Sequence, residues 1–231
     1  MLNLIKPKNI FIVIPVYNEQ EVIVTVVNNL LPYNYSLVVV DDGSENNLEL
    51  LLHGLPVFLL RHRVNLGQGA ALQTGIEFAL AENAEFIVTF DGDNQHDPED
   101  IDKLLTSLIY SKADIAIGSR FMKGSIHNIP VTRKWLLQLA RWLNYFFTGL
   151  LLTDAHNGLR ALTAKAAGHI QFKETGMAHA TEILSLIKKN KLRYIEVPVT
   201  ITYSAYSLKK GQNMGNSFRI FFDLLLNKIF R

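Results

Sequence analysis

Residues 86–98 read FIVTFDGDNQHDP, an apolar run that passes directly into an acidic loop and then into a proline. Short runs rich in Ile, Val and Phe are typical of buried strands in parallel sheets. Asp97 before Pro98 is typical of a helix start, because the aspartate can cap the first turn and proline fits its first position. The stretch therefore predicts a strand, a polar loop and a helix in succession.

The same order recurs on both sides of this stretch. Further strands are predicted at 10–16, 37–40, 57–60 and 115–117, and helices at 19–30, 69–81 and 98–111. Alternating strands and helices predict an α/β fold with a mostly parallel central sheet. After Arg120 the pattern changes to a loop, a long apolar helix, a short strand near 158–162 and a helix near 181–189.

Length and composition limit the organisation and the partners. A chain of 231 residues is too short for two ordinary enzyme domains, so we expect a single domain over 1–231. The counts of 23 basic and 21 acidic residues argue against nucleic acid as a partner. The absence of cysteine excludes disulfides and thiolate metal sites and is consistent with a cytoplasmic location.

Acidic and polar side chains follow three of the predicted strands. Tyr17 and Glu19 follow the first strand, Asp41 and Asp42 the second, and the 91–96 loop follows the strand at 86–90. Ligands of open parallel sheets bind beyond the carboxyl ends of the strands, so we expect these side chains to converge. Crowded carboxylates repel one another and are tolerated when they hold a cation or hydrogen-bond donors such as ribose hydroxyls.

Asp91 and Asp93 flank Gly92 in a DxD arrangement, and Gln95 could supply a third oxygen ligand. Oxygen ligands favour Mg²⁺ or Mn²⁺ over zinc. The bland alternative is a polar turn that caps the following helix.

Two other strand-end segments have their own alternatives. In VVVDDGS, one aspartate is expected to cap the turn while the other binds the nucleotide. The segment from Asn65 to Gly69 lacks the third glycine of a dinucleotide motif, so its glycines are expected to let the backbone approach a ribose or pyrophosphate at a helix start.

Taken together, IPVYNE, VDDGS, NLGQGAA, DGDNQHDPED, IGSRF and DAHNGLRAL resemble the family 2 inverting glycosyltransferases. The resemblance is closest to the branch of dolichyl-phosphate mannose synthases and polyprenyl-phosphate glycosyltransferases. It implies a single Rossmann-like GT-A domain, with a nucleotide-binding half at 1–120 and an acceptor-binding half at 121–231. It also implies metal-dependent transfer from GDP-mannose or a UDP-hexose to a polyprenyl or dolichyl phosphate.

The resemblance assigns roles to particular residues. The implied nucleotide site comprises Pro15, Tyr17, Glu19, Asp41, Asp42, Asn65, Gly69 and Asp91. The implied metal ligands are Asp91, Asp93 and Gln95, and the implied catalytic set is Asp93, Arg120, Asp154 and Arg160. The implied acceptor phosphate contacts are Arg133, Lys209 and Lys210. The sequence departs from the family pattern at Asn157, where serine is usual, and at the two lysines, where arginine is usual.

Two amphipathic segments, near 133–152 and 216–231, combine basic residues with aromatic ones. They suit helices that lie on a membrane, and the first is interrupted by Arg141 and Asn144, which argues against a span. We therefore expect peripheral association with the cytoplasmic membrane face. The alternatives are a core-facing stripe formed by Trp135, Leu139, Trp142 and Phe146 in the first segment, and a docked helix or homo-oligomer contact in the second.

Other functions are also open at this point. A family 2 glycosyltransferase acting on a sugar hydroxyl in cell-surface polysaccharide synthesis would need a carboxylate base such as Asp154 or Glu182. A non-catalytic nucleotide-binding module of the receiver kind would use the strand-end aspartates but needs only about half this length. A nucleotidyltransferase is disfavoured because the first strand is followed by Pro15 to Asn18 and not by a glycine- and arginine-rich loop.

Overall fold

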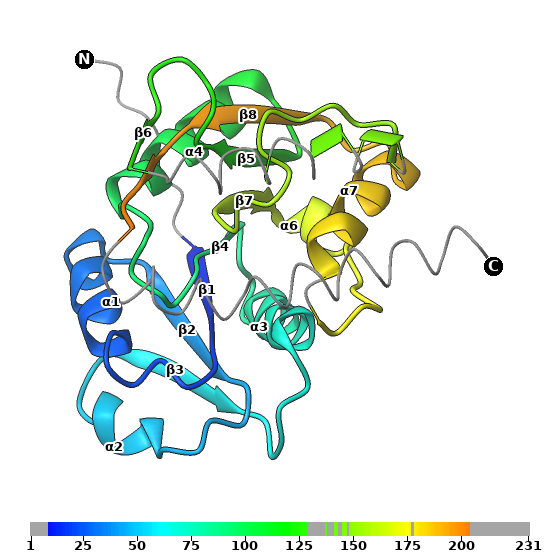
Figure 1. Ribbon diagram of the computed structural model, residues 1–231. Helices are drawn as coiled ribbons and strands as arrows, with labels where there is room; N and C mark the ends of the chain where they lie inside the picture. Colours follow the sequence, from blue (N-terminus) through cyan, green and yellow to red (C-terminus); the bar gives the residue numbers. More distant parts are fainter. Residues whose placement is uncertain are drawn as a thin grey trace.

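The computed structural model describes residues 9–128, 137, 141, 142, 145, 146, 148–176 and 178–203. Its central feature is a seven-stranded sheet in the order β3-β2-β1-β4-β7-β5-β8, which is accompanied by a small sheet of β6 and β9. Figure 1 shows β1 near the middle of the molecule, with helices on both sides of the sheet. The predicted α/β fold with a mostly parallel sheet is confirmed.

The strands of the large sheet are short and mostly buried. They are β1 (Ile10–Val16), β2 (Ser36–Asp41), β3 (Val57–Arg61), β4 (Phe86–Thr89), β5 (Ile115–Ser119), β7 (Arg160–Thr163) and β8 (Tyr194–Pro198). The small sheet pairs β6 (Ile126–His127) with β9 (Thr200–Ile201). Every residue of β1 is buried, as expected for the central strand of a sheet covered on both faces.

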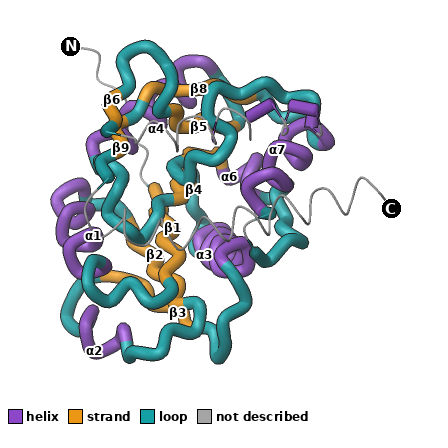
Figure 2. The backbone as a smooth tube through the Cα atoms, viewed as in Figure 1, coloured by secondary structure: helices purple, strands orange, loops and turns teal. Residues whose placement is uncertain are grey.

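The helices form two layers that cover opposite faces of the sheet (Figure 2). The helices are α1 (Ile23–Leu30), α2 (Leu48–Leu52), α3 (Gln68–Ala81), α4 (Glu99–Ser111), α6 (Ala164–Ala167) and α7 (His179–Lys189), with the 3₁₀ turn η1 (Leu31–Tyr33). One core contains the buried faces of α1, α2 and α4, and the other contains those of α3, α6 and α7. Alternate side chains of β1 enter the two cores, so this strand joins both layers.

The sequence located most of these elements within one or two residues. The largest shift is at α1, which begins at Ile23 although a helix was predicted from Glu19. The carbonyl of Glu19 accepts hydrogen bonds from the amides of Val22 and Ile23, so residues 19–22 form a turn before the helix. The carboxylate of Asp97 accepts from the amide of Glu99 at 3.0 Å, which is the capping contact expected at the start of α4.

One feature of the sheet departs from the division into two halves. β7, from the second half of the chain, is antiparallel and lies between β4 and β5 of the first half. The five strands predicted before Arg120 are therefore not contiguous in the sheet. β8, which the sequence did not predict, then adds to the outer edge of β5 in parallel.

A candidate active site at the carboxyl ends of the strands

A cavity of about 550 Å³ opens where the loops after β1, β2 and β4 meet the start of β7. Ten of the residues singled out from the sequence line it: Pro15, Tyr17, Glu19, Asp42, Asn65, Asp91, Asp93, Gln95, Arg120 and Arg160. Asp41, Gly69 and Asp154 are not among the lining residues. Arg133, Lys209 and Lys210 lie outside the described residues, as do 204–231.

The two aspartates after β2 have different surroundings. Asp41 is fully buried, accepts a hydrogen bond from the amide of Ser44 at 2.9 Å and forms an ion pair with Arg61 at 3.2 Å. It therefore caps the turn, which is the role expected for one member of this pair. Asp42 lines the cavity, and it accepts hydrogen bonds from the amides of Leu66 (2.9 Å) and Gly67 (2.7 Å).

His62 supports Asp42 from outside the cavity. Its Nδ1 lies 2.8 Å from the Asp42 carboxylate, and its Nε2 lies 3.0 Å from the hydroxyl of Thr74 in α3. Asp42 thus links the end of β2 to His62 and to the 65–67 segment, and it holds that segment beside the cavity. The role of His62 was not predicted from the sequence, because its partners are distant along the chain and no motif contains it.

Gly69 has a different role from the one expected. Its amide donates to the carbonyl of Thr175 at 2.7 Å, and a Cβ at this position would lie 2.2 Å from the carbonyl oxygen of Glu174. The 174–176 segment therefore covers the start of α3 in the place where we expected a ribose or pyrophosphate to approach. The glycine is needed for chain packing, and its amide is already bonded.

Asp91 and Asp93 lie together after β4. His96 Nε2 lies 3.0 Å from one carboxylate oxygen of Asp91, and the side-chain amide of Gln68 donates to the other oxygen at 3.2 Å. The backbone amide and the side-chain amide of Gln95 both donate to Asp93. The DxD motif and its glutamine are thus assembled at one wall of the cavity.

The two carboxyl groups differ in their acidity. Burial raises the pKa of Asp91, but the hydrogen bond from His96 and the charges of His96 and Arg160 outweigh it, so the pKa falls below its ordinary value. Burial and the negative charge of Asp91 raise the pKa of Asp93 to about 6. The site therefore holds a repulsion between neighbouring carboxylates that a bound cation would relieve.

Gly158 allows Asp91 to occupy its position. A Cβ at Gly158 would lie 2.1 Å from an Asp91 carboxylate oxygen, so no larger residue fits without displacing this side chain. The glycine of DAHNGLR and the first aspartate of the DxD motif, which are far apart in the sequence, are thus in direct contact.

Arg160 provides positive charge in the same cavity. It is 2% exposed, and its Nε is buried without a hydrogen-bond partner among the described residues. Burial lowers the pKa of Arg160 to about 10 in spite of the nearby charges of Asp91 and Asp154, so the guanidinium remains charged at neutral pH. A buried cation with an unused donor is suited to bind an anionic group in the cavity.

Two histidines, His156 and His179, also line the cavity, and both are neutral at pH 7. Burial lowers the pKa of His156 and that of His179 to about 4. His179 Nδ1 lies 2.8 Å from the carbonyl of Gly176, which can only accept, so this nitrogen carries the proton. His156 belongs to the DAHNGLR motif, whereas none of the motifs quoted from the sequence contains His179.

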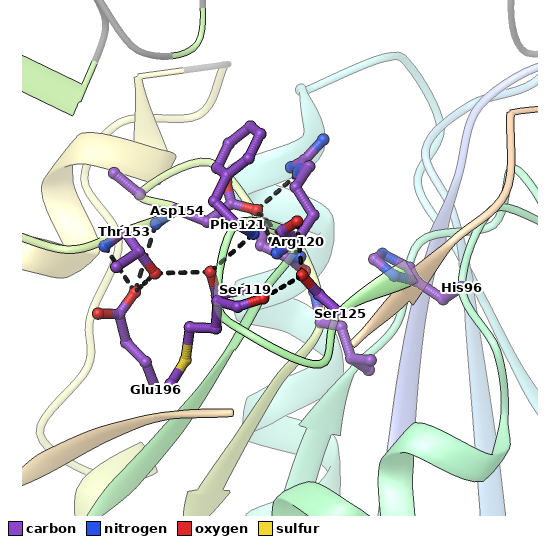
Figure 3. Close-up of polar contacts among 12 residues, drawn as sticks. His96, Ser119, Arg120, Phe121, Ser125, Thr153, Asp154 and Glu196 are labelled. Atoms are coloured by element: carbon purple, nitrogen blue, oxygen red, sulfur yellow. Dashed lines mark hydrogen bonds and ion pairs between the residues drawn. The ribbon is translucent and has the colours of Figure 1, made fainter. Parts of the chain in front are cut away.

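Arg120 and Asp154 form a buried ion pair (Figure 3), whose Nε to Oδ2 distance is 2.5 Å. The same carboxylate oxygen accepts from the backbone amide of Arg120, and the guanidinium also donates to the hydroxyl of Tyr203 at 2.7 Å. Burial lowers the pKa of Arg120, but Asp154 and Tyr203 raise it further, and the net shift is upward. Arg120 lines the cavity, whereas Asp154 holds it from behind.

The side-chain oxygens at the wall of Asp91 and Asp93 are of the kind that bind a divalent cation. Two carboxylates and an amide side chain share one wall, and the pKa of Asp93 is raised by its burial and by the negative charge of Asp91. Within the described residues no three His, Asp or Glu side chains are grouped as a complete ligand set. Asp91, Asp93 and Gln95 would therefore hold the ion together with oxygens of a bound ligand.

A doubly wound sheet with paired carboxylates and a buried arginine at its carboxyl edge is typical of α/β enzymes that bind phosphorylated ligands such as nucleotides. The sequence profile of glycosyl transferase family 2 matches residues 11–169, and the protein belongs to this family. It is a glycosyltransferase, which overturns the alternative of a non-catalytic nucleotide-binding module.

Individual relatives are consistent with this assignment. An uncharacterised protein of Methanocaldococcus jannaschii is 36% identical over 99% of this chain and 96% of its own. The UDP-N-acetylglucosamine–dolichyl-phosphate N-acetylglucosaminyltransferase of Methanococcus voltae is 33% identical over 96% of this chain and 97% of its own. The predicted resemblance to the polyprenyl-phosphate branch is thereby confirmed.

The fold also matches solved structures. Glucosyl-3-phosphoglycerate synthase from Mycobacterium tuberculosis, crystallised with Mn²⁺, UDP-glucose and glycerol 3-phosphate, superposes with a TM-score of 0.62. The match covers 90% of this chain and 76% of that one at 18% identity, so it supports the GT-A fold and not a shared substrate.

Proposed function

We propose that this protein transfers a hexose from a nucleoside diphosphate sugar to a polyprenyl phosphate, with inversion at the anomeric carbon and with Mg²⁺ or Mn²⁺. One observation carries the choice of acceptor. The cavity presents the buried cation Arg160, while the two carboxylates named from the sequence as candidate bases for a hydroxyl acceptor are bonded elsewhere and do not line it.

The two candidate bases are Asp154 and Glu182. Asp154 neutralises Arg120 and also accepts from the backbone amide of that residue. Glu182 accepts hydrogen bonds of 2.9–3.1 Å from the backbone amides of Lys173 and Glu174. A hydroxyl nucleophile would need a base within hydrogen-bond reach, whereas a phosphate oxygen is already anionic at neutral pH. The arrangement therefore favours a phosphate acceptor.

The donor is proposed to bind along the wall formed by the loops after β1, β2 and β4. Tyr17, Glu19, Asp42 and Asn65 line this side and are suited to hold the base and ribose. Asp91, Asp93 and Gln95 would hold the cation near the diphosphate. When bound, a divalent cation supplies positive charge that stabilises the leaving diphosphate.

Arg160 is proposed to act on the phosphates. Its guanidinium keeps its charge, has an unused donor and faces the same cavity as the carboxylates. It can bind a phosphate oxygen and thereby orient the acceptor toward the anomeric carbon. The Methanococcus voltae relative is named as a transferase that acts on dolichyl phosphate, which supports an acceptor of this class.

A lipid acceptor requires access to a membrane surface. Two members of the core stripe considered as an alternative for the 133–152 segment, Trp142 and Phe146, are 58% and 78% exposed and do not face the core, and the other two lie outside the described residues. We propose that this segment and 216–231 contact the cytoplasmic face of the membrane, with Arg133, Lys209 and Lys210 near the acceptor phosphate. In the part of the chain that the structure describes, no helix has the length and apolarity needed to cross a bilayer.

The test is a transfer assay with labelled UDP-N-acetylglucosamine, UDP-glucose and GDP-mannose. Each donor is offered polyprenyl phosphate in detergent micelles or soluble sugars, with Mg²⁺, Mn²⁺ or a chelator. We expect product only with the lipid phosphate and only with a divalent cation, and proton NMR of the product should show an inverted anomeric configuration. Preferential transfer to soluble sugars would refute the proposed acceptor.

A pair of variants links the assay to the cavity. Arg160→Met removes the charge at similar volume, and Arg160→Lys retains it without the planar fork. We expect the KM for polyprenyl phosphate to rise in the order wild type, Lys, Met. An identical KM in all three would contradict the role assigned to Arg160.

A further inference from the structure

A second hydrogen-bonded chain runs beside the Arg120–Asp154 ion pair. The residue before each ion-pair member belongs to it: Ser119 precedes Arg120, and Thr153 precedes Asp154. The hydroxyls of Ser119 and Thr153 lie 2.6 Å apart, and Thr153 in turn contacts Glu196 of β8 (Figure 3). The two segments that hold the ion pair are thus joined twice, once by charge and once by hydroxyls.

The chemistry of the groups fixes the direction of this chain. Glu196 can only accept, so the Thr153 hydroxyl donates its proton to the carboxylate at 2.6 Å. The Ser119 hydroxyl must then donate to Thr153, and Ser119 accepts from the amide of Phe121 at 3.2 Å. All donors point toward one carboxylate, an arrangement in which each hydrogen bond strengthens the next.

Glu196 also holds the backbone of the same turn. Its Oε1 accepts from the amide of Thr153 at 2.7 Å and from that of Asp154 at 3.3 Å, in addition to the Thr153 hydroxyl. One half-buried carboxylate oxygen therefore receives three donors from two consecutive residues. β8 pairs in parallel with β5, with Glu196 opposite Ile117, so this anchor belongs to the rigid sheet.

The turn that Glu196 holds sets the position of Arg120. Asp154 binds both the amide and the Nε of Arg120, so a shift of the 153–154 turn moves the carboxylate that orients the guanidinium. Arg120 lines the cavity, whereas Glu196, Thr153 and Ser119 do not. Their influence on a ligand must therefore act through Arg120.

We propose that Glu196 is a positioning residue for the transfer reaction: by anchoring the 153–154 turn to β8, it holds Asp154 and thereby Arg120 in the orientation that binds the acceptor. This inference rests on the proposed function for its kinetic effect. Arg120 is thereby assigned to the acceptor. The residues that support Arg120 are distinct from those of the donor-binding wall.

The kinetic test compares Glu196→Ala, Glu196→Gln and wild type. The glutamine keeps an oxygen that can accept the three donors, whereas alanine removes it. We expect Glu196→Ala to raise the KM for polyprenyl phosphate roughly 10- to 100-fold, as for a displaced binding group, with Glu196→Gln between alanine and wild type. The KM for the nucleotide sugar should stay within about twofold of wild type, since Glu196 supports no donor contact.

A second measurement does not depend on activity. In ¹⁵N-labelled protein, the Nε–H of Arg120 is held by a buried carboxylate and should exchange slowly with solvent, and its signal can be assigned from Arg120→Lys. We expect Glu196→Ala to accelerate this exchange at least about tenfold, as expected from local opening of the turn. If wild type does not use polyprenyl phosphate, the proposed function fails while this measurement still tests the role of Glu196.

Asp114→Asn is the matched control. Asp114 precedes β5 and accepts from the backbone and side chain of Arg193, which precedes β8, so it joins the same two strands at the end away from the cavity. This variant should leave both KM values and the Arg120 exchange rate unchanged. Equal effects of Asp114→Asn and Glu196→Ala, or unchanged Arg120 exchange in Glu196→Ala, would overturn the proposal.

Discussion

The two walls of the cavity handle buried charge in opposite ways. At one wall Asp91 and Asp93 lie together, and among the described residues neither forms an ion pair with a lysine or arginine. At the other wall Arg120 lines the cavity and is paired with Asp154 behind it at 2.5 Å, and the segments of both residues are tied to Glu196. A bound cation would stabilise the first wall, whereas the charges of the second are paired within the protein. The Asp91 and Asp93 carboxylates are thus suited to bind a cationic ligand, whereas Arg120 is held in place by the protein itself.

The largest effect is expected for Asp93→Asn. Because Asp93 is assigned to the cation, we expect transfer to fall by at least roughly 100-fold, the scale seen when a group that stabilises developing charge is removed. The measurement is kcat at saturating donor and acceptor, with Mg²⁺ and with Mn²⁺. Turnover at the wild-type rate would remove the assigned metal role.

The same variant should change stability in the other direction. The pKa of Asp93, about 6 in the folded protein against an ordinary 3.8, means that the folded state binds this proton more tightly than the unfolded chain. Protonation of Asp93 therefore stabilises the folded protein fully below pH 3.8, and this stabilisation is lost as the pH rises through 6. In chelator, Asp93→Asn should exceed wild type in free energy of unfolding by about 3 kcal/mol at pH 7.5, and by less at pH 5. A constant difference across this pH range would contradict the assignment.

Asp154→Asn tests the opposite wall and should destabilise the protein. It leaves the guanidinium of Arg120 buried without its carboxylate, and breaking a buried pair from one side costs about 3–5 kcal/mol. Urea unfolding at pH 7.5 gives the comparison with Asp93→Asn directly. If both substitutions shift the free energy of unfolding in the same direction, the contrast between the two walls is wrong.

A smaller effect is expected at Asn18, which joins the loops after β1 and β2. It has a φ of 55°, accepts from the amide of Glu45 at 3.1 Å and donates its own amide to Ser44 at 3.0 Å. Tyr17 and Glu19 on either side line the cavity. Asn18→Ala should lower the free energy of unfolding by about 1–2 kcal/mol, because alanine disfavours this backbone conformation, and should raise the KM for the donor a few-fold.

Asn18→Gly separates the two contributions. Glycine accepts the positive φ but lacks the side-chain contact, so it should restore part of the stability and little of the donor affinity. A glycine variant with the donor KM of wild type would show that the side chain has no part in donor binding.

The sequence predicted the Asp91 wall better than the Asp154 wall, for a physical reason. Strands 10–16, 37–40 and 86–90 are buried on both faces, so they appear as continuous apolar runs, and the residues that follow them must lie at one sheet edge. Asp42, Asp91 and Asp93 were found in this way. β8 is only partly buried, and its segment KLRYIEVPVT gives no continuous run.

The support of the Asp154 wall could not be predicted from local patterns. Glu196 contacts Thr153, and Tyr203 contacts Arg120, across 43 and 83 residues. Only the folded sheet brings these groups together. The role of Gly69 was also hidden, because the segment that covers it comes from residues 174–176. A glycine pattern indicates close approach of a backbone but not whether a ligand or another part of the chain makes it.

The antiparallel β7 has a consequence for the order in which the protein can be assembled. Both neighbours of β5, β7 and β8, come later in the chain, so β5 has no pairing partner while a ribosome is still making residues 120–159. Throughout that interval the outer edge of β4 is unpaired as well, and unpaired strand edges in incomplete chains invite intermolecular association. In the nascent polypeptide the edges of β4 and β5 therefore stay unpaired until residues 160–163 emerge and form β7 between them.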